Sequence, residues 1–82
     1  MDTLQYARDI LRTSLQLGDR ANDLQRESPL MGNFPEFNSL TVVGIVSAIE
    51  EQTGSSVDDK EITAEIFETV GTLADFIESK LT

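Results

Sequence analysis

Residues 40–53, LTVVGIVSAIEEQT, form one unbroken apolar-rich segment that ends at Gly54. Valine and isoleucine favour strands, but a strand usually runs ~3–10 residues and this segment runs 14. At about 100° per residue, most of its apolar side chains fall on one broad face of a helix. That face carries Val42, Val43, Ile45, Val46 and Ile49, and the other carries Thr41, Gly44, Ser47, Glu51 and Gln52. The segment is therefore predicted to be a helix.

Three other segments show the same periodicity. Near the N-terminus, apolar residues spaced three or four apart predict a helix from Thr3 to Leu17 that ends at Gly18. Thr69 is a suitable N-cap for a last helix. A short helix is expected in EITAEIFE, residues 61–68. The inward-facing residues are Leu4, Ala7, Ile10, Leu11 and Leu15 in the first helix, Ile62, Ile66 and Phe67 in the short one, and Val70, Leu73, Phe76, Ile77 and Leu81 in the last.

These segments predict an all-α fold. We expect a small four-helix bundle, made of three main helices and a short third helix, with residues 1–82 forming a single domain. Residues 18–38 contain two prolines and weak periodicity, which predicts a long loop between the first two helices. Apolar residues within this loop are expected to insert into the core and hold it in place: Leu24, Leu30, Met31, Phe34 and Phe37.

The chain contains no cysteine and no histidine. This composition excludes disulfides, Cys/His metal sites, cysteine nucleophiles and a Ser-His-Asp triad. A calcium site in VDDKE, residues 57–61, would lack the EF-hand pattern, so a solvated acidic turn is expected there. We expect no catalytic residue and no bound metal.

The net charge of −9 is unevenly distributed. Residues 1–26 carry four acids and four arginines, whereas residues 27–82 carry eleven acids against Lys60 and Lys80. Such a surface repels nucleic acid and anionic membranes and attracts basic protein patches. Neither a signal peptide nor a membrane-spanning segment is evident, so we expect a soluble, cytoplasmic protein with no membrane insertion.

Ser39 stands where the long loop becomes the second helix. Serine is a favoured N-cap, so capping alone would explain it. However, a helix N-terminus also favours an attached phosphate. Leu40 follows directly on the polar side of the helix, and Gly44, Ser47 and Ala48 would let another protein approach closely. From the residues alone, both a cap and an attachment point remain open.

The segment FNSLTVVGIVSAIEEQTG resembles the phosphopantetheine attachment region of acyl carrier and peptidyl carrier proteins. In that family, a loop ending in Asp-Ser-Leu opens the second helix, and Asn38-Ser39-Leu40 stands at that tripeptide. The apolar positions of the helix match at Val43, Val46 and Ile49, and its acidic end matches at Glu50 and Glu51. ETVGTLADFIESKL is similar to the last helix of the family.

The resemblance implies that Ser39 carries 4'-phosphopantetheine, taken from coenzyme A by a phosphopantetheinyl transferase. It implies a non-catalytic, monomeric bacterial carrier that holds acyl groups as thioesters. Its partners would be acyl-loading and acyl-transferring enzymes with basic docking patches. The residues implied in partner recognition are Asn38, Leu40, Gly44, Ser47, Glu50 and Glu51.

Two departures from the family pattern indicate specialised partners. Asn38 replaces the aspartate that assists transferase recognition, and Gly44 replaces a glutamate of many fatty-acid carriers. We therefore expect a specialised lipid, secondary-metabolite or exopolysaccharide pathway, as distinct from general fatty acid biosynthesis. The alternatives are a peptidyl or aminoacyl carrier, and a structural adaptor of the same fold that is not modified.

Overall fold

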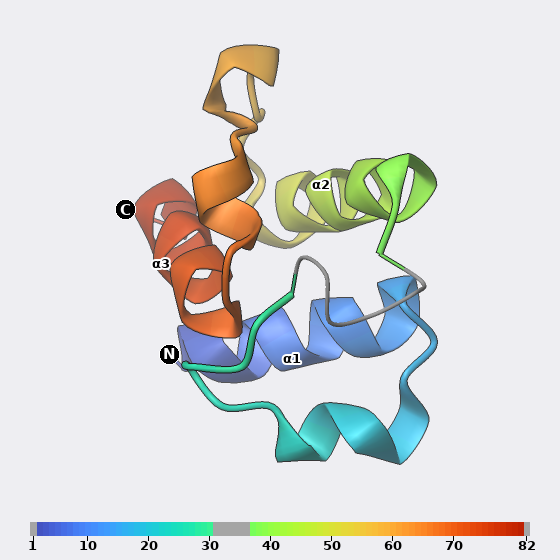
Figure 1. Cartoon of the computed structure of the whole chain (residues 1–82). Coiled ribbons are helices and arrows are strands. Elements are labelled where there is room, and N and C mark those ends of the chain that lie inside the picture. The colour runs from blue at the N-terminus through green and yellow to red at the C-terminus, as the bar shows by residue number, and fades with distance from the viewer. Residues whose placement is uncertain (1, 31–36, 82) are drawn as a thin grey trace.

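The computed structural model describes residues 2–30 and 37–81, in which helices are joined by turns and loops (Figure 1). The three α-helices are α1 (Thr3–Ser14), α2 (Ser39–Thr53) and α3 (Val70–Leu81). Three short 3-10 helices connect them: η1 (Gly18–Asp23), η2 (Asp59–Glu61) and η3 (Ala64–Phe67). The predicted all-α architecture with a long connection after the first helix is confirmed.

Helix α1 contacts both α2 and α3, and η1 packs on its other side (Figure 1). The predicted inward residues of α1 and α3 form the centre of the core, where Leu11, Leu73 and Ile77 are fully buried. From α2, Ile45 and Ile49 are buried, while Val42 and Val46 pack against the core and remain half-buried. These apolar stripes account for how the helices pack against one another.

Helix α1 ends at Ser14, three residues before the predicted end at Leu17. Gln16 adopts a left-handed conformation (φ 53°), and the Leu17 N–H donates to the Arg12 carbonyl at 3.0 Å. This is the hydrogen bond of a Schellman C-cap, in which glycine usually takes the left-handed position. The prediction was wrong because it assigned that role to Gly18, which instead begins η1.

The loop after η1 closes the N-terminus of α3. The backbone N–H groups of Val70 and Gly71 donate to the carbonyls of Ser28 and Arg26, each at 2.9 Å. A Cβ atom on Gly71 would lie 2.8 Å from the Arg26 oxygen, so a glycine is needed at this contact. The loop thus satisfies N–H groups that have no partner within the helix itself.

Apolar residues hold this loop in the core, as predicted. Leu24 and Leu30 are buried, and Phe37 is half-buried and packs against the core. The predicted anchors Met31 and Phe34 lie outside the described residues.

The short helix predicted over residues 61–68 is present as the shorter η3, and η2 precedes it as a separate 3-10 turn. Ile62 and Thr63 adopt extended conformations between η2 and η3 and so separate the two. The expected inward side chains are nevertheless inward, since Phe67 is buried and Ile62 and Ile66 are half-buried against the core. Within residues 2–30 and 37–81, no helix combines the length and apolar character required to cross a bilayer.

Candidate functional site

Asn38 is the N-cap of α2, which excludes the open possibility that Ser39 fills this position. The Asn38 Oδ1 atom accepts hydrogen bonds from the N–H groups of Leu40 and Thr41, at 2.9 and 3.2 Å. In return, the Asn38 N–H donates to Thr41 Oγ1 at 2.8 Å. This reciprocal arrangement is a capping box, and it satisfies the free N–H groups of the first turn without Ser39.

Ser39 is therefore the first residue of α2, and its side chain is exposed. Its hydroxyl has no hydrogen-bond partner among the residues that the structure describes. The first turn of α2 contains no acidic residue, so the positive end of the helix dipole is not offset there by a carboxylate. A hydroxyl in this position is accessible, and an anion attached to it would be stabilised.

A surface hollow of about 470 Å³ opens beside this hydroxyl. Its described lining is mainly apolar and consists of Phe37, Asn38, Ser39, Val42 and Val43. Phe37 packs edge-to-face on the buried Phe67, with the ring centroids 5.5 Å apart. This contact anchors the chain on η3 just before the Asn38 cap, and so positions the start of α2.

The exposed face of α2 begins with two large apolar side chains. Leu40 is 83% exposed and Val43 is 64% exposed. The exposure of Leu40 was expected, but Val43 was predicted to face the core. Val43 precedes the exposed Ser47 by one helical turn, so the two residues lie on the same side of α2. The polar residue at position 47 is the sequence signal from which the outward position of Val43 could have been predicted.

Of the six residues proposed for partner recognition, five are exposed: Asn38, Leu40, Gly44, Ser47 and Glu51. Glu50 differs, because its Oε2 atom accepts a hydrogen bond from the Val57 N–H at 2.7 Å. The Glu50 carboxylate thus ties the end of α2 to the loop that follows it. Sequence reasoning missed this structural role, since a contact over seven residues leaves no periodic signal.

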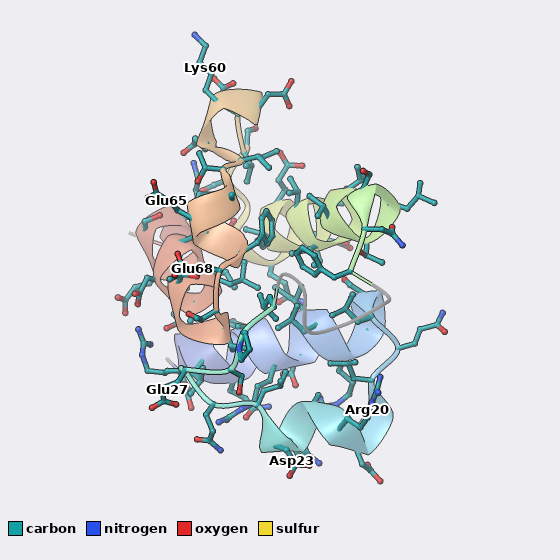
Figure 2. All side chains as sticks on the ribbon, in the orientation of Figure 1. Arg20, Asp23, Glu27, Lys60, Glu65 and Glu68 are labelled. Atoms are coloured by element: carbon teal, nitrogen blue, oxygen red, sulfur yellow. The ribbon has the colours of Figure 1, made fainter. Side chains whose placement is uncertain are left out.

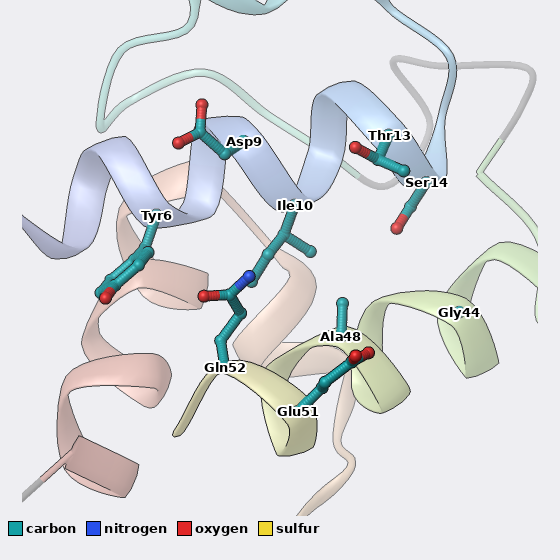
Figure 3. Close-up of a pocket in the computed structure, with 9 residues that line it drawn as sticks. All are labelled: Tyr6, Asp9, Ile10, Thr13, Ser14, Gly44, Ala48, Glu51 and Gln52. Carbon is teal, nitrogen blue, oxygen red and sulfur yellow. The ribbon is translucent and has the colours of Figure 1, made fainter. Parts of the chain in front are cut away.

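Gly44 and Glu51 also border a groove of about 470 Å³ between α1 and α2 (Figure 3). Ile10 and Ala48 form its apolar floor, and Tyr6 closes one end. A Cβ atom on Gly44 would meet no atom within 4 Å, so packing does not require glycine here. The small residues at positions 44 and 48 keep this groove open.

The described part of the chain contains no group of three or more acidic, histidine or cysteine side chains arranged to hold a metal ion. The VDDKE segment forms η2, whose Asp58 and Glu61 side chains cap its own backbone. The exposed hydroxyl at the start of α2 therefore remains the candidate site for chemistry.

A scan of protein-family models finds no match to the chain, and a search of curated proteins finds no significant one. Among solved structures, the chain is similar to a holo acyl carrier protein from Nitrosomonas europaea, determined by solution NMR. The two chains are 48% identical over 99% of this chain and 98% of the other, and they superpose with a TM-score of 0.89.

This similarity extends over the loop, the capped helix and the last helix, and so over every element that positions Ser39. The predicted resemblance to carrier proteins is confirmed, and with it the expectation of a carrier that is not itself an enzyme. The chain belongs to the acyl carrier protein family.

Proposed function

We propose that Ser39 Oγ is the attachment point of a 4'-phosphopantetheine group. The supporting observation is the geometry at the start of α2: Asn38 caps the helix, and the Ser39 hydroxyl is left exposed. To form the phosphodiester, Ser39 Oγ would bond to the phosphorus next to the pantetheine of coenzyme A. The pyrophosphate bond would break, the nucleotide half would leave, and the hydroxyl proton would pass to a base of the transferase.

The surroundings of Ser39 fit such a group. The phosphodiester would lie at the positive end of α2, with no carboxylate in the first turn to repel it. The adjoining hollow lined by Phe37, Val42 and Val43 offers apolar surface to an attached chain. When bound, the group supplies a thiol that holds acyl groups as thioesters. The chain has no cysteine, so the thiol of the attached group would be the only thiol of the modified protein.

The exposed face of α2 is the surface on which we place partner enzymes. Leu40 and Val43 provide an apolar contact next to Ser39, and Gly44 and Ser47 allow close approach. Glu51 provides an exposed carboxylate for basic patches of a phosphopantetheinyl transferase or an acyl-transferring enzyme. Tethering raises the local concentration of the acyl group at each enzyme visited.

Four finer expectations remain part of this proposal. Residues 1–82 would act as one carrier domain and as a monomer, since a carrier must present the same face to successive enzymes. Asn38 and Gly44, which depart from the pattern of fatty-acid carriers, favour a specialised lipid, secondary-metabolite or exopolysaccharide pathway. The cytoplasmic location stays a prediction.

Intact-mass spectrometry after incubation with coenzyme A and a broad-specificity transferase tests the proposal. The parent chain should gain one phosphopantetheine, and Ser39→Ala should gain none. Ser56→Ala is the matched control, because it removes an exposed hydroxyl away from the docking face of α2, and it should be modified like the parent. If Ser39→Ala were modified as well, the attachment point would lie elsewhere.

The same experiment separates the alternatives. An adaptor of the same fold would gain no mass with any transferase, and Ser39→Ala would retain every partner. A peptidyl carrier would be modified but would accept its cargo from an adenylating amino-acid enzyme. Membership of the acyl carrier family favours the acyl assignment over this last one.

A further inference from the structure

A second groove, of about 370 Å³, lies between η3 and α3. Its lining residues are Glu65, Ile66, Thr72, Asp75, Phe76 and Ser79. Ile66 and Phe76 form an apolar floor, since both are half-buried and pack against the core. Figure 1 shows that α3 and the first turn of α2 lie on opposite sides of the molecule. The groove is therefore well separated from the Ser39 site.

Hydrogen bonds hold the two walls of this groove together. Thr72 Oγ1 lies within hydrogen-bonding distance of the Thr69 carbonyl (2.8 Å) and of the Ile66 carbonyl (3.1 Å), and so links α3 to η3 through a shared proton. The Thr72 N–H donates to Thr69 Oγ1 at 3.1 Å, and this capping contact fixes the first turn of α3. The groove is thus preformed, so a ligand would not have to open it.

The rim of the groove is strongly acidic. Glu65 is exposed and its carboxylate has no hydrogen-bond or ion-pair partner among the described residues, while Asp75 pairs with Arg26 at 2.8 Å. Further carboxylates lie nearby. After Asp75, Glu78 and Glu27 also raise the pKa of Arg26 through charge attraction. Glu68 projects from the same side of the molecule as Glu65 (Figure 2). Lys80 lies over the Phe76 ring, 5.7 Å from its centroid, but its ammonium pairs with Glu61.

We propose that this groove binds a basic, amphipathic segment of a partner protein. An apolar side chain of that segment would rest on Ile66 and Phe76, and its lysine or arginine side chains would face Glu65 and the neighbouring carboxylates. A second copy of the chain does not fit, because each copy carries a net charge of −9. Nucleic acids and anionic membranes are disfavoured for the same reason.

Such a contact would leave Ser39 accessible. A protein bound between η3 and α3 could hold the carrier while the start of α2 is presented to an enzyme. This use rests on the proposed function, but binding at the groove does not.

The test is an NMR titration of the isotope-labelled chain with a synthetic peptide of leucine and lysine at helical spacing. Amide shifts should centre on Glu65, Ile66 and Phe76, and an all-lysine peptide of equal length should bind more weakly. Glu65→Lys should weaken binding by about fivefold, because it replaces attraction by repulsion at the rim. Asp23→Lys makes the same change on η1, away from the groove (Figure 2), and should alter the affinity by less than about twofold.

Equal weakening by the two substitutions would mean general attraction to an acidic protein and would overturn the proposal. So would shifts that centre on Leu40 and Val43 of α2. Ser39→Ala should bind the peptide as the parent does, because the groove does not involve the arm. The peptide titration therefore tests the groove alone, and the mass measurement tests the attachment site alone, so failure of one proposal is distinguished from failure of the other.

Discussion

At the scale of single residues, the start of α2 separates capping from attachment. Asn38 uses its side-chain oxygen for two backbone N–H groups, and Thr41 completes the capping box. Sequence reasoning identified Ser39 as the important hydroxyl and left open whether it is a cap or an attachment point. Asparagine and serine cap helices about equally well, so residue type alone does not show which of these two neighbours is the cap.

Two substitutions at Asn38 separate stability from recognition. Asn38→Ala removes the cap and should lower the free energy of unfolding by about 1 kcal/mol, as measured by urea denaturation. Asn38→Asp keeps the cap, should leave stability nearly unchanged, and should speed modification by a fatty-acid-type transferase. An unchanged modification rate in Asn38→Asp would show that this position does not set the choice of transferase.

At the scale of elements, the connection between α2 and η3 is tied at both of its ends. Glu50 binds the Val57 N–H from α2, and Ser55 Oγ donates to the Lys80 carbonyl of α3 at 3.0 Å. The Lys80 ammonium lies 2.5 Å from Glu61 Oε1. The ammonium of Lys80 and the N–H of Asp58 both lower the pKa of Glu61. The segment thus acts as a strap from α2 to α3.

This strap predicts a pH dependence with a definite sign. Because the pKa of Glu61 is lowered by folding, its stabilisation is complete above the ordinary value of about 4.5 and is lost as pH falls through the lowered pKa. Lys80→Met should therefore lower stability near neutral pH and have less effect at about pH 3. Urea unfolding at both pH values measures this, with Lys60→Met as the control for loss of an exposed lysine. An equal effect of Lys80→Met at the two pH values would contradict the role of the pair.

Helix interiors were more predictable than helix ends. The stripes of α1 and α3 follow from the spacing of apolar residues, and Gly54 ends α2 in the left-handed conformation expected of glycine (φ 71°). The end of α1 depends on Gln16, whose left-handed backbone is not favoured by its side chain. The short helix likewise begins at Ala64, later than predicted, because Ile62 and Thr63 adopt extended conformations.

At the scale of the whole molecule, acidic side chains greatly outnumber their ion-pair partners. The net charge is −9, and the ion pairs of the described residues include Asp9–Arg12, Asp75–Arg26 and Glu61–Lys80. The unpaired carboxylates repel one another and oppose compaction. The same excess of charge would attract basic partners.

Salt should therefore stabilise the fold. Raising the ionic strength to about 0.5 M shortens the range of repulsion, and a gain of about 1 kcal/mol would raise the Tm by ~4–8 °C for a chain of this size. Thermal unfolding followed by circular dichroism measures this. Sodium and tetramethylammonium chloride should act alike if screening is the cause. A Tm that falls with salt would mean that ion pairs outweigh repulsion.

The measurement that most directly tests the attachment site is fragment-ion mass spectrometry of the parent chain after modification. It locates the added group without relying on any variant. We predict that the phosphopantetheine mass resides on Ser39 alone, so that it is absent from the N-terminal fragment ending at Asn38 and present in the one ending at Ser39. The same mass on Ser47 or any other hydroxyl, with Ser39 unmodified, would contradict the account.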